Sequence, residues 1–467
     1  MRFKEKNTCK ECRQYKAHCE DSTVCNPIRR KLRNYNGIRF TSDGFDCALP
    51  VGIDSHTVCS FGCLYCFSDN LVQHRESARR NAGQTSLKKI ERIFSGAEGK
   101  TNALYRKGLK YGKKKNGYPC PVQLGAITDP LDNIERNQGW FLKFVELCKK
   151  YNQPVRISTK GNLFLTDEYI NALKDKPHLF RVHYSIISPD EELLPQIDLR
   201  APPPSERIEC MRRLEAIGVE TCLRFRPILP GISDSTKNHP EAYKDLIDMA
   251  ADAGCKNISY EVGFVPGMMT KDLRKRWKQI EKITGKPLMQ IYKQFGKSQA
   301  CTRSHHSWTE QIMHSIRDHA KKRGMRVGVS DPLWKQLTDS GCCCAIAEDN
   351  PVFGNWQRKN ATEALYQAKK TGKLICSKDI IPDWAYNADE GLLVNPGVGP
   401  TVRYKRKYKK WADTLFETWT QLKKERSPLN YFQGALLPVK KQDGDIYFKY
   451  KGLERKKPKK TPFWNIK

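Results

Sequence analysis

Residues 59–67 read CSFGCLYCF, so Cys59, Cys63 and Cys66 fall within eight positions. A structural zinc ion is usually closed by four ligands, and Cys47 or His56 is near enough in the sequence to supply the fourth. In an iron–sulfur cubane each iron takes one protein ligand, so three cysteines would leave one iron open. The spacing CxxxCxxC therefore indicates either a zinc site or a cluster with an open iron.

The chain around this loop alternates short β-branched runs with helical patterns from residue 46 to about 265, which is typical of repeated βα units. We expect helices near 85–95, 138–151, 166–174, 204–217 and 239–253. We expect strands at 47–53, 122–128, 154–159, 180–187, 221–229 and 257–264. Six such units predict an α/β fold with a partial (β/α)6 TIM-type barrel, whose chemistry lies at the carboxyl ends of the strands.

The first segment, residues 1–40, has too few apolar residues to build a core of its own. It carries four cysteines at metal-ligand spacings, and a bound metal would hold it together. Zinc is the usual occupant of such a closed four-thiolate site, and an auxiliary iron–sulfur cluster is the alternative. The four predicted ligands are Cys9, Cys12, Cys19 and Cys25.

The βα pattern fades after about residue 268. We therefore expect the barrel at 41–267, a helical or mixed extension with a cysteine-rich segment at 268–402, and a basic aromatic tail at 403–467. The tail holds 19 Lys and Arg against 6 Asp and Glu. Basic residues interleaved with aromatic ones suit a phosphate backbone and unstacked bases, although a small packed subdomain with a solvated rim is equally compatible.

The cysteine-rich segment contains three consecutive thiols, whose side chains cannot all point at one metal. One or two of them could join another cysteine in an extra cluster, and buried thiols are the default interpretation. The residues concerned are Cys342, Cys343 and Cys344, with Cys301 or Cys376 as partners.

Charge and cysteine usage narrow the class of protein. The chain has 83 Lys and Arg against 51 Asp and Glu, a formal charge of +32, which favours nucleic acid as a partner over a merely solvated basic surface. There is no signal-peptide pattern and no run of 18 apolar residues, so we expect a cytoplasmic protein with no membrane partner. In that compartment the 18 cysteines are ligands or buried thiols rather than disulfides.

Several motifs follow the cysteine loop in a fixed order. They are AITDPLDNIE (126–135), ISTKGNL (157–163), HYSIIS (183–188) and LRAPPPSERIECMRRLEAIGVETCLRFRPILPGISD (199–234). Together with the loop they resemble the radical S-adenosylmethionine (radical SAM) superfamily, and within it the spore photoproduct lyase-like branch, over about residues 46–235. The resemblance implies a [4Fe-4S] cluster on Cys59, Cys63 and Cys66. Its open iron would bind the methionine part of SAM, and reductive cleavage would release a 5′-deoxyadenosyl radical.

The same resemblance implies a SAM pocket at the strand ends. Tyr65 would lie against the adenine, and Thr128 and Asp129 would hydrogen-bond the amino group. Lys160 would pair with the carboxylate, and Ser185 would reach the ribose. A zwitterion needs an anion for its ammonium and a cation for its carboxylate, which agrees with these residue types.

The chain departs from spore photoproduct lyase at one position. That enzyme has a cysteine after the second strand that returns a hydrogen atom to the product radical, whereas this chain has Ala126. Repair of a photoproduct by the same route is therefore in doubt. Cys222 and Tyr260 are conceivable hydrogen donors, although a buried Cys or Tyr on a strand usually belongs to the core.

These patterns support three hypotheses about function. The first is a radical SAM enzyme that modifies or repairs a nucleobase, with DNA favoured over RNA and a flavodoxin or ferredoxin as electron donor by analogy. The second is a radical SAM enzyme that modifies a peptide or protein. The third is a nucleic-acid binding protein with a structural or redox-sensing cluster, against which the predicted SAM pocket argues.

Overall fold

The structure is a computed structural model of the 467-residue chain. The residues that it describes are 33–35, 37–40, 46–47, 49, 51–66, 68, 83–96, 117–266, 271–293, 301–303, 306–354, 359–381, 393–394, 409–424 and 427–452. The predicted four-cysteine module at Cys9, Cys12, Cys19 and Cys25 lies outside the described residues. Within them, no helix is long and apolar enough to cross a membrane.

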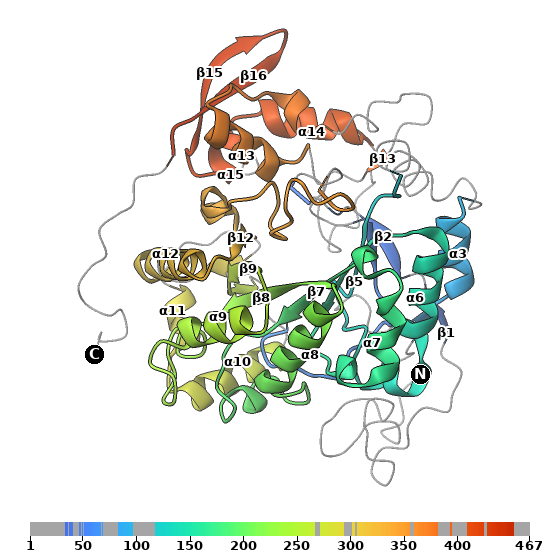
Figure 1. Ribbon diagram of the computed structural model, residues 1–467. Helices are drawn as coiled ribbons and strands as arrows, with labels where there is room; N and C mark the ends of the chain where they lie inside the picture. Colours follow the sequence, from blue (N-terminus) through green and yellow to red (C-terminus); the bar gives the residue numbers. More distant parts are fainter. Residues whose placement is uncertain are drawn as a thin grey trace.

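One sheet of eight strands forms the centre of the molecule, in the order β12-β9-β8-β7-β6-β5-β3-β2 (Figure 1). All neighbours in it run parallel, except that β2 pairs antiparallel with β3 at one edge. The strands are β2 (Ile38–Phe40), β3 (Val51–Ile53), β5 (Val122–Leu124), β6 (Val155–Thr159), β7 (Phe180–Ser185), β8 (Glu220–Ile228), β9 (Asn257–Val262) and β12 (Arg326–Val329).

This order confirms the predicted parallel sheet of a partial TIM-type barrel, because each successive βα unit adds its strand on the same side of the last. The predicted number of strands was too low, since β12 adds a seventh parallel strand beside β9. The sequence pattern missed it because a long excursion separates the two strands. That excursion contains β10 (Phe264–Pro266), α10 (Lys271–Thr284), α11 (Leu288–Lys293) and β11 (Cys301–Arg303) before α12 (His306–Lys322).

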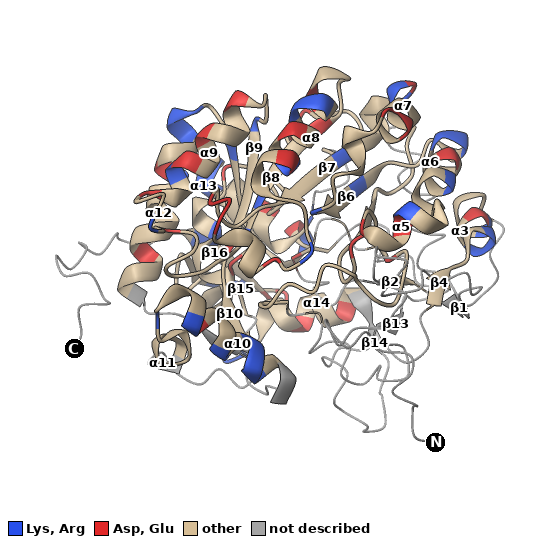
Figure 2. Ribbon diagram, turned by 90° about the horizontal axis from the view of Figure 1, so that it is seen from below, with Lys and Arg blue, Asp and Glu red and all other residues tan. Residues whose placement is uncertain are grey.

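Helices cover the outer face of the sheet. Alternate residues of β7 show why the strand has two different faces: Phe180, Val182 and Tyr184 join the main hydrophobic core, whereas Arg181, His183 and Ser185 do not. The covering helices include α3 (Leu87–Phe94), α5 (Asn133–Gln138), α6 (Trp140–Tyr151), α7 (Asp167–Lys174), α8 (Pro204–Ala216) and α9 (Ala242–Asp252). Figure 2 shows basic and acidic residues interspersed along these helices.

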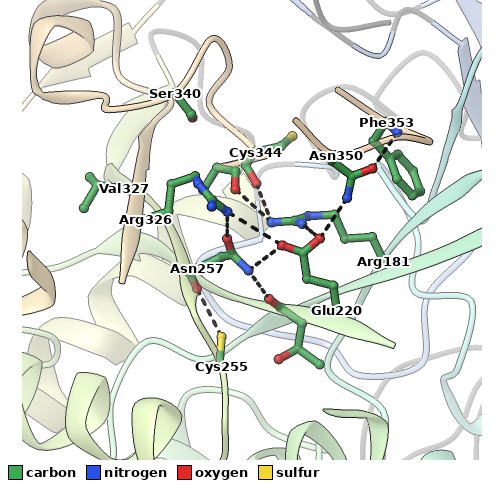
Figure 3. A network of polar contacts seen from close by, with 12 residues as sticks. Arg181, Glu220, Cys255, Asn257, Arg326, Val327, Ser340, Cys344, Asn350 and Phe353 are labelled. Atoms are coloured by element: carbon green, nitrogen blue, oxygen red, sulfur yellow. Dashed lines mark hydrogen bonds and ion pairs between the residues drawn. The ribbon is translucent and has the colours of Figure 1, made fainter. Parts of the chain in front are cut away.

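The amino ends of the strands are closed by residues 340–354, as Figure 3 shows. Arg181 forms a close ion pair with Glu220 of the next strand and donates to the carbonyl of Ala345 at 2.9 Å. Asn257 donates to Glu220 at 2.9 Å, and Arg326 donates to Asn257 at 2.8 Å. This end of the barrel is therefore occupied by structural contacts, which leaves the carboxyl ends for chemistry.

A second, smaller core joins α13 (Ala361–Thr371), α14 (Trp411–Thr420), α15 (Pro428–Tyr431) and the hairpin of β15 (Leu436–Gln442) and β16 (Asp445–Tyr450). Figure 1 shows this unit stacked beyond β12. Trp419, Phe432 and Phe448 are fully buried in it. Residues on both sides of the expected boundary at 402/403 share this core, and the division into domains remains a prediction.

Three two-stranded pairs complete the described elements. They are the parallel pair β1 (Arg33–Tyr35) and β4 (Gly83–Thr85), the antiparallel pair β10 and β11, and the antiparallel pair β13 (Leu393–Val394) and β14 (Lys409–Lys410).

Candidate active site

The cysteine loop follows β3 and is tied to the carboxyl ends of other strands. The amide of Ser60 donates to Asp132 at 2.7 Å, and the amide of Leu64 donates to the carbonyl of Ile197 at 2.9 Å. Gly62 has a φ of 64°, in the left-handed region that glycine adopts without a steric penalty, and this lets the loop turn between Cys59 and Cys63. The predicted location of the loop at the active end of the barrel follows from these contacts.

The three thiols of the loop are free and differ in exposure. Cys63 is buried, whereas Cys59 and Cys66 are half-buried. Burial raises the pKa of Cys59, and the nearby carboxyls of Asp132 and Asp129 raise it further. Burial also raises the pKa of Cys63, and Asp198 adds to the effect. Thiols with raised pKa values stay protonated until a metal displaces the protons, so binding of iron would release them.

The donor chemistry of the loop fits a multi-iron cluster better than a single ion. Among the residues that the structure describes, no three His, Cys, Asp or Glu side chains lie close enough to share one metal ion. Neither Cys47 nor His56 forms such a group with the loop among these residues. In a cubane each thiolate binds its own iron, so three separated thiols on one loop are compatible with it.

Asp129 joins the carboxyl ends of β5 and β6. Its carboxylate accepts hydrogen bonds from the Thr159 hydroxyl at 2.7 Å, the Lys160 amide at 2.6 Å and the Leu131 amide at 3.0 Å. Burial raises the pKa of Asp129, and these hydrogen bonds oppose the rise. The neighbouring Thr128 hydroxyl donates to the carbonyl of His56 at 3.1 Å. Both predicted amino-group ligands thus lie at the edge of the sheet and are oriented by protein contacts.

Lys160 has a carboxylate partner that the sequence analysis did not identify. Its Nζ lies 2.8 Å from Asp198 Oδ2 and in close contact with the Tyr65 hydroxyl. Tyr65 in turn donates to Asp198 Oδ1 at 2.6 Å, and Arg207 Nη1 lies 2.9 Å from Asp198 Oδ2. Burial opposes ionisation of Asp198, but Lys160 and Arg207 hold its pKa below its usual range. The predicted adenine and carboxylate ligands are therefore fixed by one buried anion.

Ser185 lies at the carboxyl end of β7, as predicted, and is buried. Its hydroxyl accepts a hydrogen bond from Arg224 Nη1 at 3.1 Å, and its carbonyl accepts one from Arg207 at 2.9 Å. The structure thus brings Lys160 and Ser185 together through Asp198 and Arg207, although Asp198 follows Lys160 by 38 residues.

The turn after β5 is organised by Asp54. Its carboxylate Oδ1 accepts hydrogen bonds from the amides of Ala126 at 3.1 Å, Ile127 at 2.8 Å and Thr128 at 3.4 Å. The side chain of Ala126 in this turn is a methyl group, which carries no S–H or O–H hydrogen. Asp54 was missed by the sequence analysis, although an acid directly after a buried strand is a signal that could have found it.

The two conceivable hydrogen donors lie apart from this site. The Tyr260 hydroxyl donates to the carbonyl of Met313 at 2.9 Å in α12, within the main core. Cys222 is fully buried on β8, next to His183 of β7 in the sheet register, and lies two residues before Arg224 along the strand. The structure therefore does not bring Tyr260 to the site, and it places Cys222 beneath it.

The remaining cysteines occupy other places. Cys342 and Cys344 are buried with Leu49 and Phe353 in a small cluster at the amino ends of the strands, and Cys343 packs against it. Cys376 caps a short helix in the second unit, and Cys301 falls in β11. Within the described part of the chain, Cys342, Cys343, Cys344 and Cys376 form no metal-binding group of three.

Comparison with protein families identifies the barrel. Residues 53–239 match the family model described as the radical SAM superfamily. These residues form a radical SAM domain. This result confirms the predicted superfamily and agrees with the expectation of a SAM-dependent enzyme, while it leaves the type of reaction open. The family implies a [4Fe-4S] cluster and SAM. The additional zinc site or second cluster stays a prediction.

The curated relatives that match this chain carry the name uncharacterized protein. Proteins of Mycobacterium bovis and Mycobacterium tuberculosis are each 25% identical to it over 138 residues, which is 30% of this chain. The match spans 39% of the length of these relatives.

Solved structures with a similar arrangement include spore photoproduct lyase and a peptide-binding enzyme. A spore photoproduct lyase mutant with bound AdoMet and dinucleoside spore photoproduct is 16% identical, with a TM-score of 0.43 over 64% of this chain and 79% of that chain. Streptococcus suis SuiB bound to precursor peptide SuiA is 13% identical, with a TM-score of 0.32 over 52% of this chain and 48% of that chain. Both TM-scores are below 0.5, and we transfer no activity from these structures.

Proposed function

We propose that this radical SAM protein uses a 5′-deoxyadenosyl radical to abstract hydrogen from a nucleobase, or from a substituent of one, in nucleic acid. DNA is the preferred substrate in this proposal, and the outcome is repair or modification. The observation that carries the proposal is the family match across the barrel, together with the gathering of the cysteine loop, Asp129, Lys160 and Ser185 at the carboxyl ends of neighbouring strands. A cytoplasmic location belongs to the same proposal.

In this proposal Cys59, Cys63 and Cys66 hold the cluster. When bound, a [4Fe-4S] cluster with an open iron supplies the electron that cleaves SAM reductively. The roles of the chain's own residues are binding and orientation. Asp129 holds the turn after β5 against β6, and Asp198 keeps Lys160 and Tyr65 at fixed positions beside the cysteine loop. An external protein such as a flavodoxin or ferredoxin would deliver the electron.

Nucleic acid is favoured because of the charge of the whole chain. A formal charge of +32 on 467 residues attracts polyanions at long range, before any specific contact is made. A neutral or basic peptide would gain no comparable attraction from this excess of basic residues.

The test is anaerobic measurement of 5′-deoxyadenosine with reconstituted protein, SAM and a chemical reductant. Four reactions are compared: no addition, DNA, RNA and a peptide pool. We expect formation that DNA stimulates and that Cys63→Ala abolishes. Stimulation by peptides and not by nucleic acid would replace the proposed substrate. A protein with a full cluster that forms no 5′-deoxyadenosine under any condition would favour the third hypothesis, a nucleic-acid binding protein.

A matched pair of variants separates the SAM pocket from general folding. Asp129→Asn should lose SAM binding, because the Asp129 carboxylate is the proposed ligand of the SAM amino group and is held at the strand ends by the Lys160 and Leu131 amides. The absorbance of the cluster should be retained, because Asp129 is not one of the proposed cluster ligands. Asp167→Asn is the control, since Asp167 is exposed and pairs with the half-buried Arg213 on the outside of the barrel. Equal SAM affinity in the two variants would remove Asp129 from the proposed pocket.

A further inference from the structure

Three arginines lie on the inner face of the sheet, which the outer helices do not cover. Arg156 is on β6, and Arg224 and Arg226 are on β8. The alternation in LRFRP (223–227) places Arg224 and Arg226 on the same face of the strand, because side chains two residues apart point the same way. Phe225 between them is in the hydrophobic core. Figure 2 shows basic residues within the strands as well as on the outer helices.

The partners of these guanidinium groups are almost all neutral. Arg156 is in close contact with the Ser158 hydroxyl and the Gln123 amide oxygen. Arg224 donates to the Ser185 hydroxyl at 3.1 Å. Within the described part of the chain, neither Arg156 nor Arg224 forms an ion pair.

The positive charge of Arg226 has one carboxylate partner among the described residues, at a long distance. Arg226 donates to the Ser259 hydroxyl at 2.7 Å and contacts the Ser330 hydroxyl closely. Its Nη1 lies 3.5 Å from Glu261 Oε2, so one carboxylate serves a group of three cations. Arg181 on the same face is the contrast, because it forms a close ion pair with Glu220 at the amino end of the barrel (Figure 3).

A histidine without partners lies among these arginines. His183 pairs with Ser158 on one side and Cys222 on the other in the sheet register, and its side chain is fully buried. Neither ring nitrogen has a hydrogen-bond partner. Burial lowers the pKa of His183, and the four surrounding arginines lower it further, so the ring is neutral and retains one donor and one acceptor.

Such an arrangement is costly for the free protein. Cations that are taken out of water destabilise a fold unless opposite charges compensate them. Burial, together with Arg226 and Arg156, lowers the pKa of Arg224 to about 9, which reflects the same repulsion. The cost is avoided if an anion enters. The group keeps some contact with solvent, because the side chains of Arg226 and Glu261 are 13% and 24% exposed.

We propose that Arg224 and Arg226, supported by Arg156, bind a phosphate group of the nucleic-acid substrate at the carboxyl end of β8. This inference rests on the proposed function and adds an anchoring point to it. The planar guanidinium fork matches phosphate oxygens with two parallel hydrogen bonds. Ser185, the proposed ribose ligand, is hydrogen-bonded to Arg224, so the anchored phosphate would lie next to the SAM pocket.

The carboxylate of SAM is the other oxyanion that could enter this region. Lys160, the predicted partner of that carboxylate, is 2.8 Å from Asp198. An experiment must therefore tell a substrate phosphate from a SAM carboxylate, and it must tell both from an arginine that only supports the fold.

The first experiment is thermal unfolding of the reconstituted full-length holoprotein with and without inorganic phosphate. The variants are Arg224→Gln and Arg226→Gln, and the control is Arg212→Gln, whose side chain is 52% exposed on α8. Without phosphate, we expect the two inner-face variants to unfold at the wild-type temperature or above it. Phosphate should raise the unfolding temperature of the wild type and the control only. Lower unfolding temperatures in both variants, with equal protection of all proteins by phosphate, would make these arginines structural and overturn the proposal.

The second experiment measures binding of a single-stranded trinucleotide with phosphodiester linkages and of the same trinucleotide with neutral methylphosphonate linkages. We expect the wild type to prefer the phosphodiester, and Arg224→Gln to lose about tenfold to a hundredfold in affinity for it. Affinity for the methylphosphonate should not change. Arg224→Lys should keep the salt dependence but bind more weakly than the wild type, because the fork is lost.

The remaining outcomes separate the two proposals. Loss of SAM affinity in Arg224→Gln, with unchanged trinucleotide affinity, would assign the arginine to the SAM carboxylate and overturn the phosphate site. A wild type that binds no nucleic acid but is protected by phosphate, with protection lost in the variants, would reject the proposed substrate and support an oxyanion site. Equal binding of the charged and neutral trinucleotides would reject the site and leave the nucleic-acid function standing.

Discussion

At the scale of single residues, Asp198 decides the geometry of the predicted SAM pocket. Its carboxylate is fully buried and contacts Lys160, Tyr65 and Arg207. A buried anion with two cations in hydrogen-bond contact is strongly coupled to them, and removing it leaves both cations without their compensating charge. The two predicted cofactor ligands in this group are therefore positioned by a residue with no motif of its own.

We predict that Asp198→Asn lowers the free energy of unfolding by about 3–5 kcal/mol, because the buried Arg207 and the largely covered Lys160 lose their carboxylate partner. Urea denaturation at pH 7 measures the change. Asp175→Asn is the control, since Asp175 is 75% exposed and pairs with Lys149 on the surface. An effect of Asp198→Asn no larger than that of the control would show that the buried group is not held by this anion.

The same variant should change how stability depends on acidity. The folded-state pKa of Asp198 lies below its usual value, so its contribution to stability is present above about pH 4 and is lost as the pH falls through the folded-state pKa. The wild type should therefore lose more stability than Asp198→Asn below pH 4. Parallel curves of unfolding free energy against pH for the two proteins would contradict this.

At the scale of elements, two buried acidic residues form hydrogen bonds at the connection between α5 and α6. Asp132 caps the start of α5 by accepting from the Ile134 amide at 3.0 Å. Glu135 accepts from the Trp140 and Phe141 amides at 3.0 and 2.8 Å, which satisfies the first amides of α6. Burial raises the pKa of Asp132 to about 7 and that of Glu135 to about 8. This connection thus carries carboxyls that retain protons near neutrality.

We predict that the contribution of Glu135 to the free energy of unfolding falls as the pH rises from about 4.5 to about 8. Over that range the unfolded chain has lost the Glu135 proton while the folded protein still binds it, so the folded state holds more protons and loses stability with rising pH. Glu135→Gln should flatten the fall. The measurement is the free energy of unfolding in urea at several pH values, with Glu146→Gln, an exposed acid on α6, as the control. A fall that is equally steep in both variants would rule out Glu135 as its source.

At the scale of the whole molecule, one acid before β3 connects the barrel to the second unit. Asp46 is buried and lies 2.5 Å from Lys335 Nζ. It also accepts hydrogen bonds from the Thr362 amide at 2.8 Å and the Tyr431 hydroxyl at 2.9 Å, both of which belong to the second unit. Segments separated by more than 300 residues therefore meet at a single carboxylate.

We predict that Asp46→Ala destabilises the protein by about 3–5 kcal/mol and loosens the second unit first, since Lys335 is left buried without its partner. Hydrogen exchange should become faster in α13 and β16 before it changes in β6 and β7. Asp349→Asn, an exposed acid without an ion pair among the described residues, is the control. Uniform acceleration across both units would show that they unfold together and that Asp46 is not a local link.

The charge of the whole chain predicts strong salt dependence of nucleic-acid binding. The logarithm of the binding constant should fall linearly with the logarithm of salt concentration, by about 0.7 for each phosphate contacted on a single strand. Arg224→Gln should reduce that slope by about one contact, and Arg212→Gln should leave it unchanged. Binding that is insensitive to salt would argue against a phosphate-dominated interface altogether.

Local patterns in the sequence predicted much of the barrel. The period of two in the strands and the helical segments between them predicted a parallel sheet, and six of its seven parallel strands were placed within a few residues. The motifs at the strand ends also indicated where Cys59, Asp129, Lys160 and Ser185 would lie, because parallel strands bring their carboxyl ends to one edge. β12 was missed because β10, α10, α11 and β11 lie between β9 and the last βα unit and interrupt the βα repeat in the sequence.

What only the tertiary structure decided is which side chains meet across the sheet and between the units. Asp198 and Arg207 come from the segment after β7, and nothing in their local sequence says that they hold Lys160 and Tyr65. Arg156 and Arg224 are two strands apart in space and 68 residues apart in the chain, so their shared charge becomes visible only when β6, β7 and β8 are adjacent. Local periodicity determines which face a side chain takes, whereas long-range packing determines its neighbours and hence its chemistry.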